Sequence, residues 1–258
     1  MLPSCILALV LPLASVLAAD FTGPTLPPHL SSAALEELGK RQTQQWRTQN
    51  WGNEFSNYTW SPGPNGRFAV DWRQPNGGNF VVGRGYSLNN NNRQRIFNYS
   101  GTFTVNDRAY MCLYAWTLNP LTEWYVIENM GVHNPADNRN ATCHGRIQSD
   151  GGTYEVWSKW RINAPSIIGD ADFQQYWSIR TRRHVGGTIN TTAHLAAFRR
   201  AGLPLGAQQP VFLAVEGQVG SGAATLTAGV APTTTVPESA TPTARTELVP
   251  SRACTRVL

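Results

Sequence analysis

Short stretches in which apolar and polar residues alternate run through the chain from Trp51 to Val230, and this pattern most constrains the fold. Alternation with a period of two buries one face of an extended stretch, as in a half-buried β-strand. Gly, Asn, Pro and Asp separate the stretches, which is typical of sandwiches and barrels. The clearest stretches and turns are 67–72, 79–83, 109–116, 152–160 and 176–180, with Asn-Gly at 65–66 and Asp-Gly at 150–151. The pattern predicts a single antiparallel, all-β domain.

One stretch departs from the alternation. Residues 191–202 place Leu195 and Phe198 at helical spacing. Threonines at its start are candidate caps, and Gly202 is a stop signal. We therefore expect one short α-helix on the β-domain, with no βαβ rhythm and no internal repeat.

Both ends of the chain differ from this region in composition. Residues 1–18 are apolar but too few to span a bilayer, so we expect a secretory signal peptide. Residues 19–41 end in a dibasic pair and are either a removable pro-segment or an exposed linker. Residues 231–258 are rich in Thr and Pro, and we expect a disordered tail. The folded domain is thus expected over 42–230.

Charge and cysteine usage narrow the function classes. The formal net charge of +5 comes from scattered Lys and Arg, which favours attraction to acidic polymers over nucleic-acid binding. Cys5 lies in the expected signal peptide and Cys254 in the tail, which leaves Cys112 and Cys143 in the domain. Their spacing matches no metal site, and whether they form a disulfide stays open.

Two glutamates interrupt apolar strands and are the main candidates for chemistry. On an extended strand Glu123, Tyr125 and Ile127 point to the same face. A charged side chain is seldom buried without a partner, so Glu123 faces a cleft or forms an ion pair, for which Arg161 is the candidate. Glu216 lies in a second apolar strand. Two such carboxylates in an aromatic-rich chain suggest an enzyme that hydrolyses sugar bonds.

Several segments, taken in order, resemble the glycoside hydrolase family 11 endo-β-1,4-xylanases. The segments are 78–85, 98–101, 113–121, 122–128, 161–169, 173–180 and 214–217. The resemblance implies a β-jelly roll of two twisted antiparallel sheets that form a cleft, with one short helix. It also implies a secreted, monomeric enzyme that acts on xylan, without a cofactor, a nucleic-acid partner or a membrane.

The resemblance assigns Glu123 as the nucleophile and Glu216 as the general acid/base. A retaining glycosidase places two carboxyls about 5–5.5 Å apart. Two like charges at that separation do not both ionise easily, so the pKa of the acid is raised while the nucleophile stays charged.

The resemblance also assigns residues that bind the substrate. These are Trp60, Asn79, Tyr114, Tyr125, Arg161, Pro165 and Gln175. Trp60 would stack on a distal xylose, and Pro165 lies in the loop that matches the family's thumb. Asn79 stands beside the acid/base, and family members with Asn there work nearer neutral pH. We therefore expect a pH optimum of about 5.5–7.

The chain also departs from the family pattern. Met130, His133, Pro210 and Gln218 stand where the family usually carries aromatic residues. Each lost ring removes about 0.5–1.5 kcal/mol of stacking, which predicts weaker substrate binding or altered subsite preference. This leaves a non-catalytic carbohydrate-binding or defence-eliciting protein as one alternative. The other is a jelly-roll endoglucanase, against which the Pro-Ser-Ile thumb argues.

Remaining polar features are interpreted as structural or as modification sites. His184 and His194 have no acidic residue at a telling spacing, so we expect surface or helix-face histidines. Four Asn-x-Ser/Thr sequons predict a glycoprotein, and they begin at Asn57, Asn98, Asn140 and Asn190.

Overall fold

The computed structural model describes residues 46–87, 96–136, 140–230 and 254. The chain divides into two units, Met1–Gln44 and Gln45–Leu258, and the description concerns the second. The expected signal peptide and pro-segment lie outside the described residues, as does the expected tail apart from Cys254.

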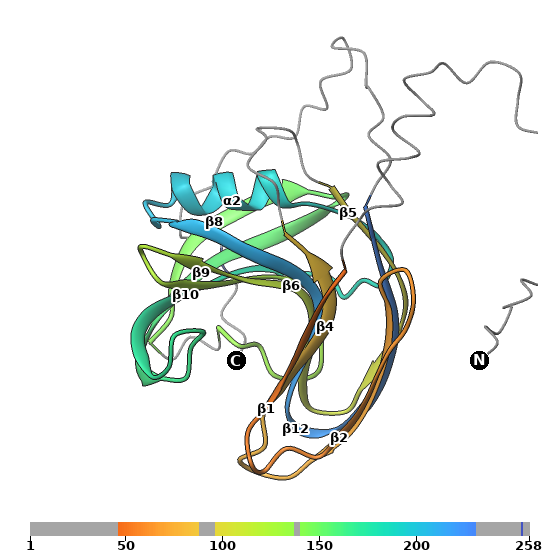
Figure 1. Cartoon of the computed structure of the whole chain (residues 1–258). Coiled ribbons are helices and arrows are strands. Elements are labelled where there is room, and N and C mark those ends of the chain that lie inside the picture. Colours follow the sequence, from red (N-terminus) through yellow and green to blue (C-terminus); the bar gives the residue numbers. More distant parts are fainter. Residues whose placement is uncertain (1–45, 88–95, 137–139, 231–253, 255–258) are drawn as a thin grey trace, which may run out of the picture. The chain divides into compact units, whose positions relative to one another are not determined.

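Two twisted sheets share one long strand, β12 (Ala207–Val230), which Figure 1 shows in blue passing from one sheet into the other. The first part of β12 pairs with β4 and β6, and the later part pairs with β3 and β5. The first sheet has the order β1-β4-β12-β6-β7-β10-β9-β8. The second has the order β2-β3-β12-β5-β11. The bounds are β1 (Arg47–Gly52), β2 (Tyr58–Pro62), β3 (Arg67–Gln74), β4 (Phe80–Tyr86), β5 (Ile96–Val105), β6 (Arg108–Leu118), β7 (Thr122–Met130), β8 (Thr142–Ser149), β9 (Gly152–Ala164), β10 (Ala171–Arg180) and β11 (Gly187–Asn190).

The jelly-roll prediction is confirmed, with one exception to its antiparallel pairing. Strands β7 and β10 are parallel, with Glu123 opposite Gln175. The sequence-based expectation of antiparallel pairing was therefore wrong at this pair, because β8 and β9 intervene in the chain but not in the sheet. Both predicted turns have positive φ at their two central residues, as type I′ turns require: 51° and 77° at 65–66, and 51° and 66° at 150–151.

Strand β7, in the middle of the first sheet, is buried on both faces along most of its length. Trp124 and Val126 belong to a cluster that also takes residues from the second sheet, such as Phe68. Tyr125 and Ile127 belong to a separate cluster on the opposite face. The alternation read from the sequence therefore divides β7 between two cores, and the second core forms the floor of the functional site.

The expected helix is α2 (Thr191–Arg200), which buries Ala197 and Phe198. The ring of Phe198 lies 5.5 Å from that of Tyr176 on β10. The expected threonine cap was wrong, because Asn190 accepts the N-cap hydrogen bond from the amide of Ala193 at 3.2 Å. Gly202 takes a left-handed φ of 74° just after the helix, as a stop signal does. No helix in the described ranges is long and apolar enough to span a bilayer.

The open question about the cysteines is answered in the negative: Cys112 and Cys143 do not form a disulfide with each other. Cys143 on β8 forms a disulfide with Cys254, 111 residues away. Cys112 is a buried free thiol on β6. The disulfide fixes one residue of the expected tail against the edge strand of the first sheet.

Candidate active site

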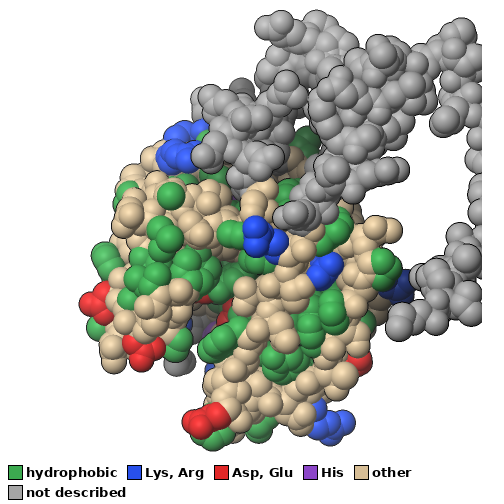
Figure 2. All heavy atoms as spheres, viewed as in Figure 1, with side chains coloured by type: hydrophobic (Ala, Val, Ile, Leu, Met, Phe, Trp, Pro, Cys, Tyr) green, Lys and Arg blue, Asp and Glu red, His purple; other side chains and the backbone are tan. Residues whose placement is uncertain are grey.

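A cleft of about 660 Å³ opens on the face of the first sheet that carries Tyr125. Figure 2 shows the surface hollowed between two lobes, with acidic and histidine side chains visible inside the hollow. Every predicted site residue except Trp60 lines the cleft: Asn79, Tyr114, Glu123, Tyr125, Arg161, Pro165, Gln175 and Glu216.

Strand register brings the two glutamates to this face. Glu216 on β12 lies opposite Tyr110 on β6, while Glu123 on β7 lies opposite Trp116 on the same strand. Strand β6 therefore stands between the two carboxylates in the sheet. Both side chains are nearly buried, with 6% of Glu123 and 5% of Glu216 exposed.

Neutral donors surround both carboxylates. Gln175 Nε2 donates to Glu123 Oε2, and the hydroxyls of Tyr114 and Tyr125 also contact this carboxyl. The Tyr125 hydroxyl donates to Glu216 Oε2 at 3.0 Å, so one phenol touches both acids. No ion pair joins Glu123 to Arg161 among the described residues; Arg161 Nη1 donates instead to Gln175 Oε1 at 3.4 Å. The ion-pair alternative for Glu123 is therefore not what the structure contains.

Burial raises the pKa of both carboxyls. For Glu123, burial and the charge of Glu216 together raise the pKa to about 7, against the hydrogen bonds from Gln175 and the tyrosines. Burial also raises the pKa of Glu216, while hydrogen bonds from Tyr110 and Tyr125 and the charge of Arg161 act in the opposite direction. Two coupled acids of this kind lose their protons in two steps that belong to the pair. The pair consequently keeps one proton at pH values where an isolated glutamate has lost its own.

Trp60, expected to stack on a sugar, does not line the cleft. It is half-buried against the core between the sheets, and its ring lies 5.3 Å from that of Phe68. Trp51 on β1 lines the cleft instead, with 40% of its surface exposed. Trp60 was predicted from segment 52–66, which matches the family pattern only loosely. Trp51 was missed because it reaches the cleft through the pairing of β1 with β4, which no local pattern predicts.

Sequence reasoning also missed other aromatic residues of the cleft. The missed rings are Tyr110, Trp116, Phe173 and Trp177. Tyr110 and Trp116 share the period of Tyr114 on β6, so strand alternation could have identified them. Trp116 packs on Phe173 with ring centroids 4.8 Å apart. The floor is therefore aromatic despite the departures from the family pattern at the rim.

The loop that follows β9 covers one side of the cleft. Pro165, Ser166 and Ile167 line the cleft from this loop. The amides and carbonyls of Ser166 and Gly169 exchange two hydrogen bonds, of 3.1 and 3.4 Å, which close a tight turn. Gly169 has φ of 97°, a conformation that favours glycine. The turn thus presents Pro165 and Ile167 from a constrained backbone.

The residues that depart from the family pattern occupy different places. His133 and Gln218 line the cleft, and Gln218 Nε2 donates to Glu216 Oε1 at 3.4 Å. Met130 packs against the aromatic floor. Among the described residues, no group of three or more His, Cys, Asp and Glu side chains is arranged to hold a metal ion.

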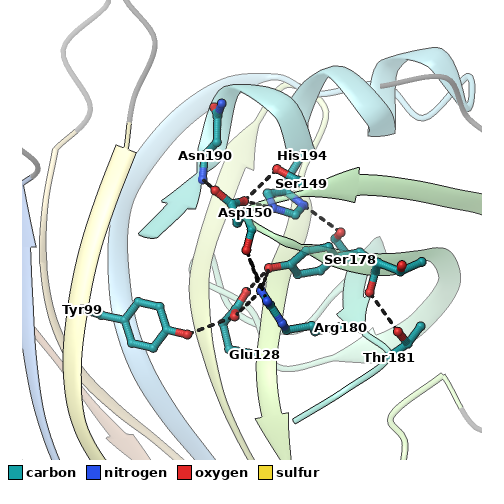
Figure 3. A network of polar contacts seen from close by, with 11 residues as sticks. Tyr99, Glu128, Ser149, Asp150, Ser178, Arg180, Thr181, Asn190 and His194 are labelled. Carbon is teal, nitrogen blue, oxygen red and sulfur yellow. Dashed lines mark hydrogen bonds and ion pairs between the residues drawn. The ribbon is translucent and has the colours of Figure 1, made fainter. Parts of the chain in front are cut away.

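A second polar cluster lies beneath α2, away from the cleft lining (Figure 3). The expectation that His194 has no acidic partner was wrong: its Nε2 lies 3.2 Å from Asp150 Oδ2, and its Nδ1 lies 2.8 Å from Ser178 Oγ. The order of these groups is that of a Ser-His-Asp triad, but His194 and Ser178 are completely buried. No substrate reaches them, so the cluster joins the helix to the sheet.

Comparisons with known proteins show the family to which the chain belongs. The family model described as "Glycosyl hydrolases family 11" matches residues 43–227. "Ethylene-inducing xylanase 1" of Verticillium dahliae is 36% identical over 220 residues, covering 83% of this chain and 94% of that protein. "Endo-1,4-beta-xylanase 3" of Pyricularia oryzae is 43% identical over 176 residues, covering 68% and 72%. A solved structure from a comparison of two major endo-1,4-β-xylanases of Trichoderma reesei superposes with a TM-score of 0.64 at 35% identity, covering 71% of this chain and 97% of that one.

Proposed function

Because this chain belongs to the glycosyl hydrolases of family 11, we propose that it is a secreted endo-1,4-β-xylanase that acts with retention. The observation that carries the proposal is the pair of buried glutamates, Glu123 and Glu216, joined through one tyrosine hydroxyl at the floor of a cleft. The enzyme cuts within the xylan backbone and releases short xylo-oligosaccharides.

In the first step Glu216 donates its proton to the oxygen of the leaving sugar while the Glu123 carboxylate attacks the anomeric carbon. Burial and the charge of Glu216 raise the pKa of Glu123, and the hydrogen bonds from Gln175, Tyr114 and Tyr125 act against this rise. Protonation of Glu216 removes the opposing charge and leaves Glu123 in the ionised form that the attack needs. Formation of the glycosyl ester removes the charge of Glu123. The pKa of Glu216 then falls, and Glu216 accepts a proton from the water that hydrolyses the ester.

Substrate binding is assigned to the aromatic floor, the thumb loop and Trp51. We place the sugar-stacking role on Trp51 because an exposed indole at a cleft supplies apolar area for a sugar ring. Tyr114, Arg161, Pro165 and Gln175 contact the sugars near the catalytic pair.

Asn79 sets the expected pH range. It lines the cleft, and its Oδ1 is buried without a hydrogen-bond partner in the part of the chain that the structure describes. An amide adds no further charge to the coupled acids, so we expect a bell-shaped pH profile centred at about 5.5–7. A bell centred below about pH 4.5 would contradict this.

Secretion and glycosylation are proposed from the sequence. Asn57 and Asn140 are exposed and suit glycan attachment. Asn98 pairs on both sides within its sheet, and Asn190 caps α2, so these two sequons are poorer sites.

The experiment that tests the function measures reducing sugar released from xylan and from carboxymethyl-cellulose by the parent, Glu123→Ala and Glu216→Ala. Hydrolysis of xylan alone, lost in both variants, supports the proposal; activity retained in both variants refutes the assigned pair. Added azide separates the roles, because it replaces the missing nucleophile in Glu123→Ala and gives an α-linked product. In Glu216→Ala it attacks the glycosyl ester and gives a β-linked product.

A folded parent without activity on either polymer would favour the alternative of a binding or eliciting protein. The name of the Verticillium dahliae relative includes ethylene induction as well as xylanase activity. Glu123→Ala tests this second candidate directly, because an eliciting function independent of hydrolysis survives in a folded, inactive variant.

A further inference from the structure

Three basic side chains line the cleft besides its two acids. They are Arg108, Lys159 and Arg161. Arg161 has a role in the catalytic centre, because its charge acts on Glu216 and its guanidinium donates to Gln175. Arg108 and Lys159 form no ion pair with any carboxylate that the structure describes.

The strand register places these two cations on either side of the catalytic pair. Arg108 lies two residues before Tyr110 on β6, and Tyr110 is the cross-strand neighbour of Glu216. Residues two apart on a strand share a face, so Arg108 lies beyond the Glu216 end of the pair. On the other side, Lys159 on β9 is the cross-strand neighbour of Gln175, which itself stands opposite Glu123.

The charge in the cleft exceeds what a neutral sugar chain requires. Three cations line the cleft against two carboxyls, and two acids this close to one another do not both ionise easily. Stacking aromatics and neutral donors are sufficient to bind an uncharged xylose chain. Two further cations in a concave, aromatic-walled site focus a positive potential on the substrate and attract anionic groups. Lys and Arg form charge-assisted hydrogen bonds with carboxylates in particular.

We infer that Arg108 and Lys159 bind the carboxylates of uronic-acid side groups, so that this cleft prefers acidic xylan to neutral xylan. The inference rests on the proposed function and specifies the substrate of the same site. The formal net charge of +5 acts in the same direction, because it increases the encounter rate with an acidic polymer.

The test compares one glucuronoxylan with the same polymer after reduction of its carboxyl groups to alcohols. We would measure kcat/KM on both polymers for the parent, Arg108→Gln, Lys159→Gln and the double variant. Arg73→Gln is the matched control, because Arg73 is an exposed cation on β3 that does not line the cleft.

We expect the parent to prefer the acidic polymer. Each cleft substitution should reduce the ratio of the two kcat/KM values by about 2- to 5-fold, the size of a solvent-accessible ion pair. The Arg73→Gln ratio should equal that of the parent. Salt at about 0.5 M should reduce the preference, because it screens charges over a few ångströms.

Equal rates of the parent on the two polymers would overturn the inference, as would a double variant that keeps the parental ratio. Failure of the parent to hydrolyse either polymer would overturn the proposed function and this inference with it. The two failures are therefore distinguishable in the same experiment.

Discussion

We predict that neutralising the buried carboxylate of Glu128 causes a large loss of stability. Glu128 is 1% exposed and accepts hydrogen bonds from Tyr154 Oη at 2.5 Å, Tyr99 Oη at 2.9 Å and Arg180 Nη1 at 3.1 Å (Figure 3). Glu128→Gln keeps the shape but turns one acceptor oxygen into a donor. At least one of the three donors then loses its acceptor, and the buried Arg180 loses its only anionic partner among the described residues.

The magnitude follows from the chemistry of a broken buried pair. Removing one partner typically costs about 3–5 kcal/mol. In a domain of this size, 1 kcal/mol corresponds to a change of about 2–4 °C in Tm. We therefore expect Glu128→Gln to lower Tm by about 6–20 °C in circular-dichroism melts at pH 6 and one scan rate.

The matched control is Asp71→Asn, which makes the same charge change at an exposed position on β3. Its effect should stay within about 0.5 kcal/mol. A Tm for Glu128→Gln equal to that of Asp71→Asn would refute the reasoning. A further check is the double variant Glu128→Met, Arg180→Met, which should be more stable than Glu128→Met alone because it leaves no unpaired charge.

Three further predictions concern single groups. Glu123 has a raised pKa in the folded state, so ionising it lowers the free energy of unfolding as pH rises above its unfolded pKa of about 4.3. The neutral variant Glu123→Gln should therefore raise Tm more at pH 8 than at pH 4.5. An equal rise in Tm at both pH values would contradict this. Burial acts to raise the pKa of Asp150, but hydrogen bonds and the charge of His194 lower it overall, so the Asp150 carboxylate contributes to the free energy of unfolding above about pH 4 and loses that contribution below it. In urea denaturation, the free energy of unfolding of Asp150→Asn should therefore depend less on pH between about pH 5 and 3 than that of the parent. An unchanged pH dependence would refute this. Tyr125→Phe removes a hydroxyl that touches both catalytic acids and should lower kcat/KM on xylan about 10- to 150-fold at unchanged Tm; a loss under 3-fold would show that the hydroxyl is dispensable.

Local patterns in the sequence predicted the features that depend only on residues close together in the chain, namely the faces of a strand and the tight turns. The alternation around Glu123 predicted which side chains share a face, and β7 has that arrangement. The turns at 65–66 and 150–151 were also predictable, because Asn-Gly and Asp-Gly supply two residues with positive φ. Such features need no knowledge of which strands pair.

Several of the features that were missed depend on pairing between distant segments. Asp150 and His194 are 44 residues apart, and Cys143 and Cys254 are 111 apart. No local period relates such residues. The sequence placed Trp60 in the cleft, where the structure has Trp51, for the same reason, since β1 reaches the cleft only by pairing with β4. The resemblance to the family predicted that Glu123 and Glu216 lie in one cleft, which the structure shows, because the family pattern reflects such long-range pairing.

The path of β12 explains why the acid/base has the surroundings it has. Directly after Glu216, the register between β12 and β6 shifts: Gly217 pairs with Ala109, but Val219 pairs with Arg108. The extra residue in this β-bulge is Gln218, and both Gln218 and Val219 consequently line the cleft. A Cβ at Gly217 would meet the ring of Phe80, so only glycine lets the strand pass this point. The turn of β12 from one sheet into the other thus begins beside the catalytic acid, and it brings Gln218 against Glu216 and Arg108 to the edge of the cleft. The same irregularity that joins the sheets therefore sets both the hydrogen bonding of the acid/base and the charge that the substrate meets.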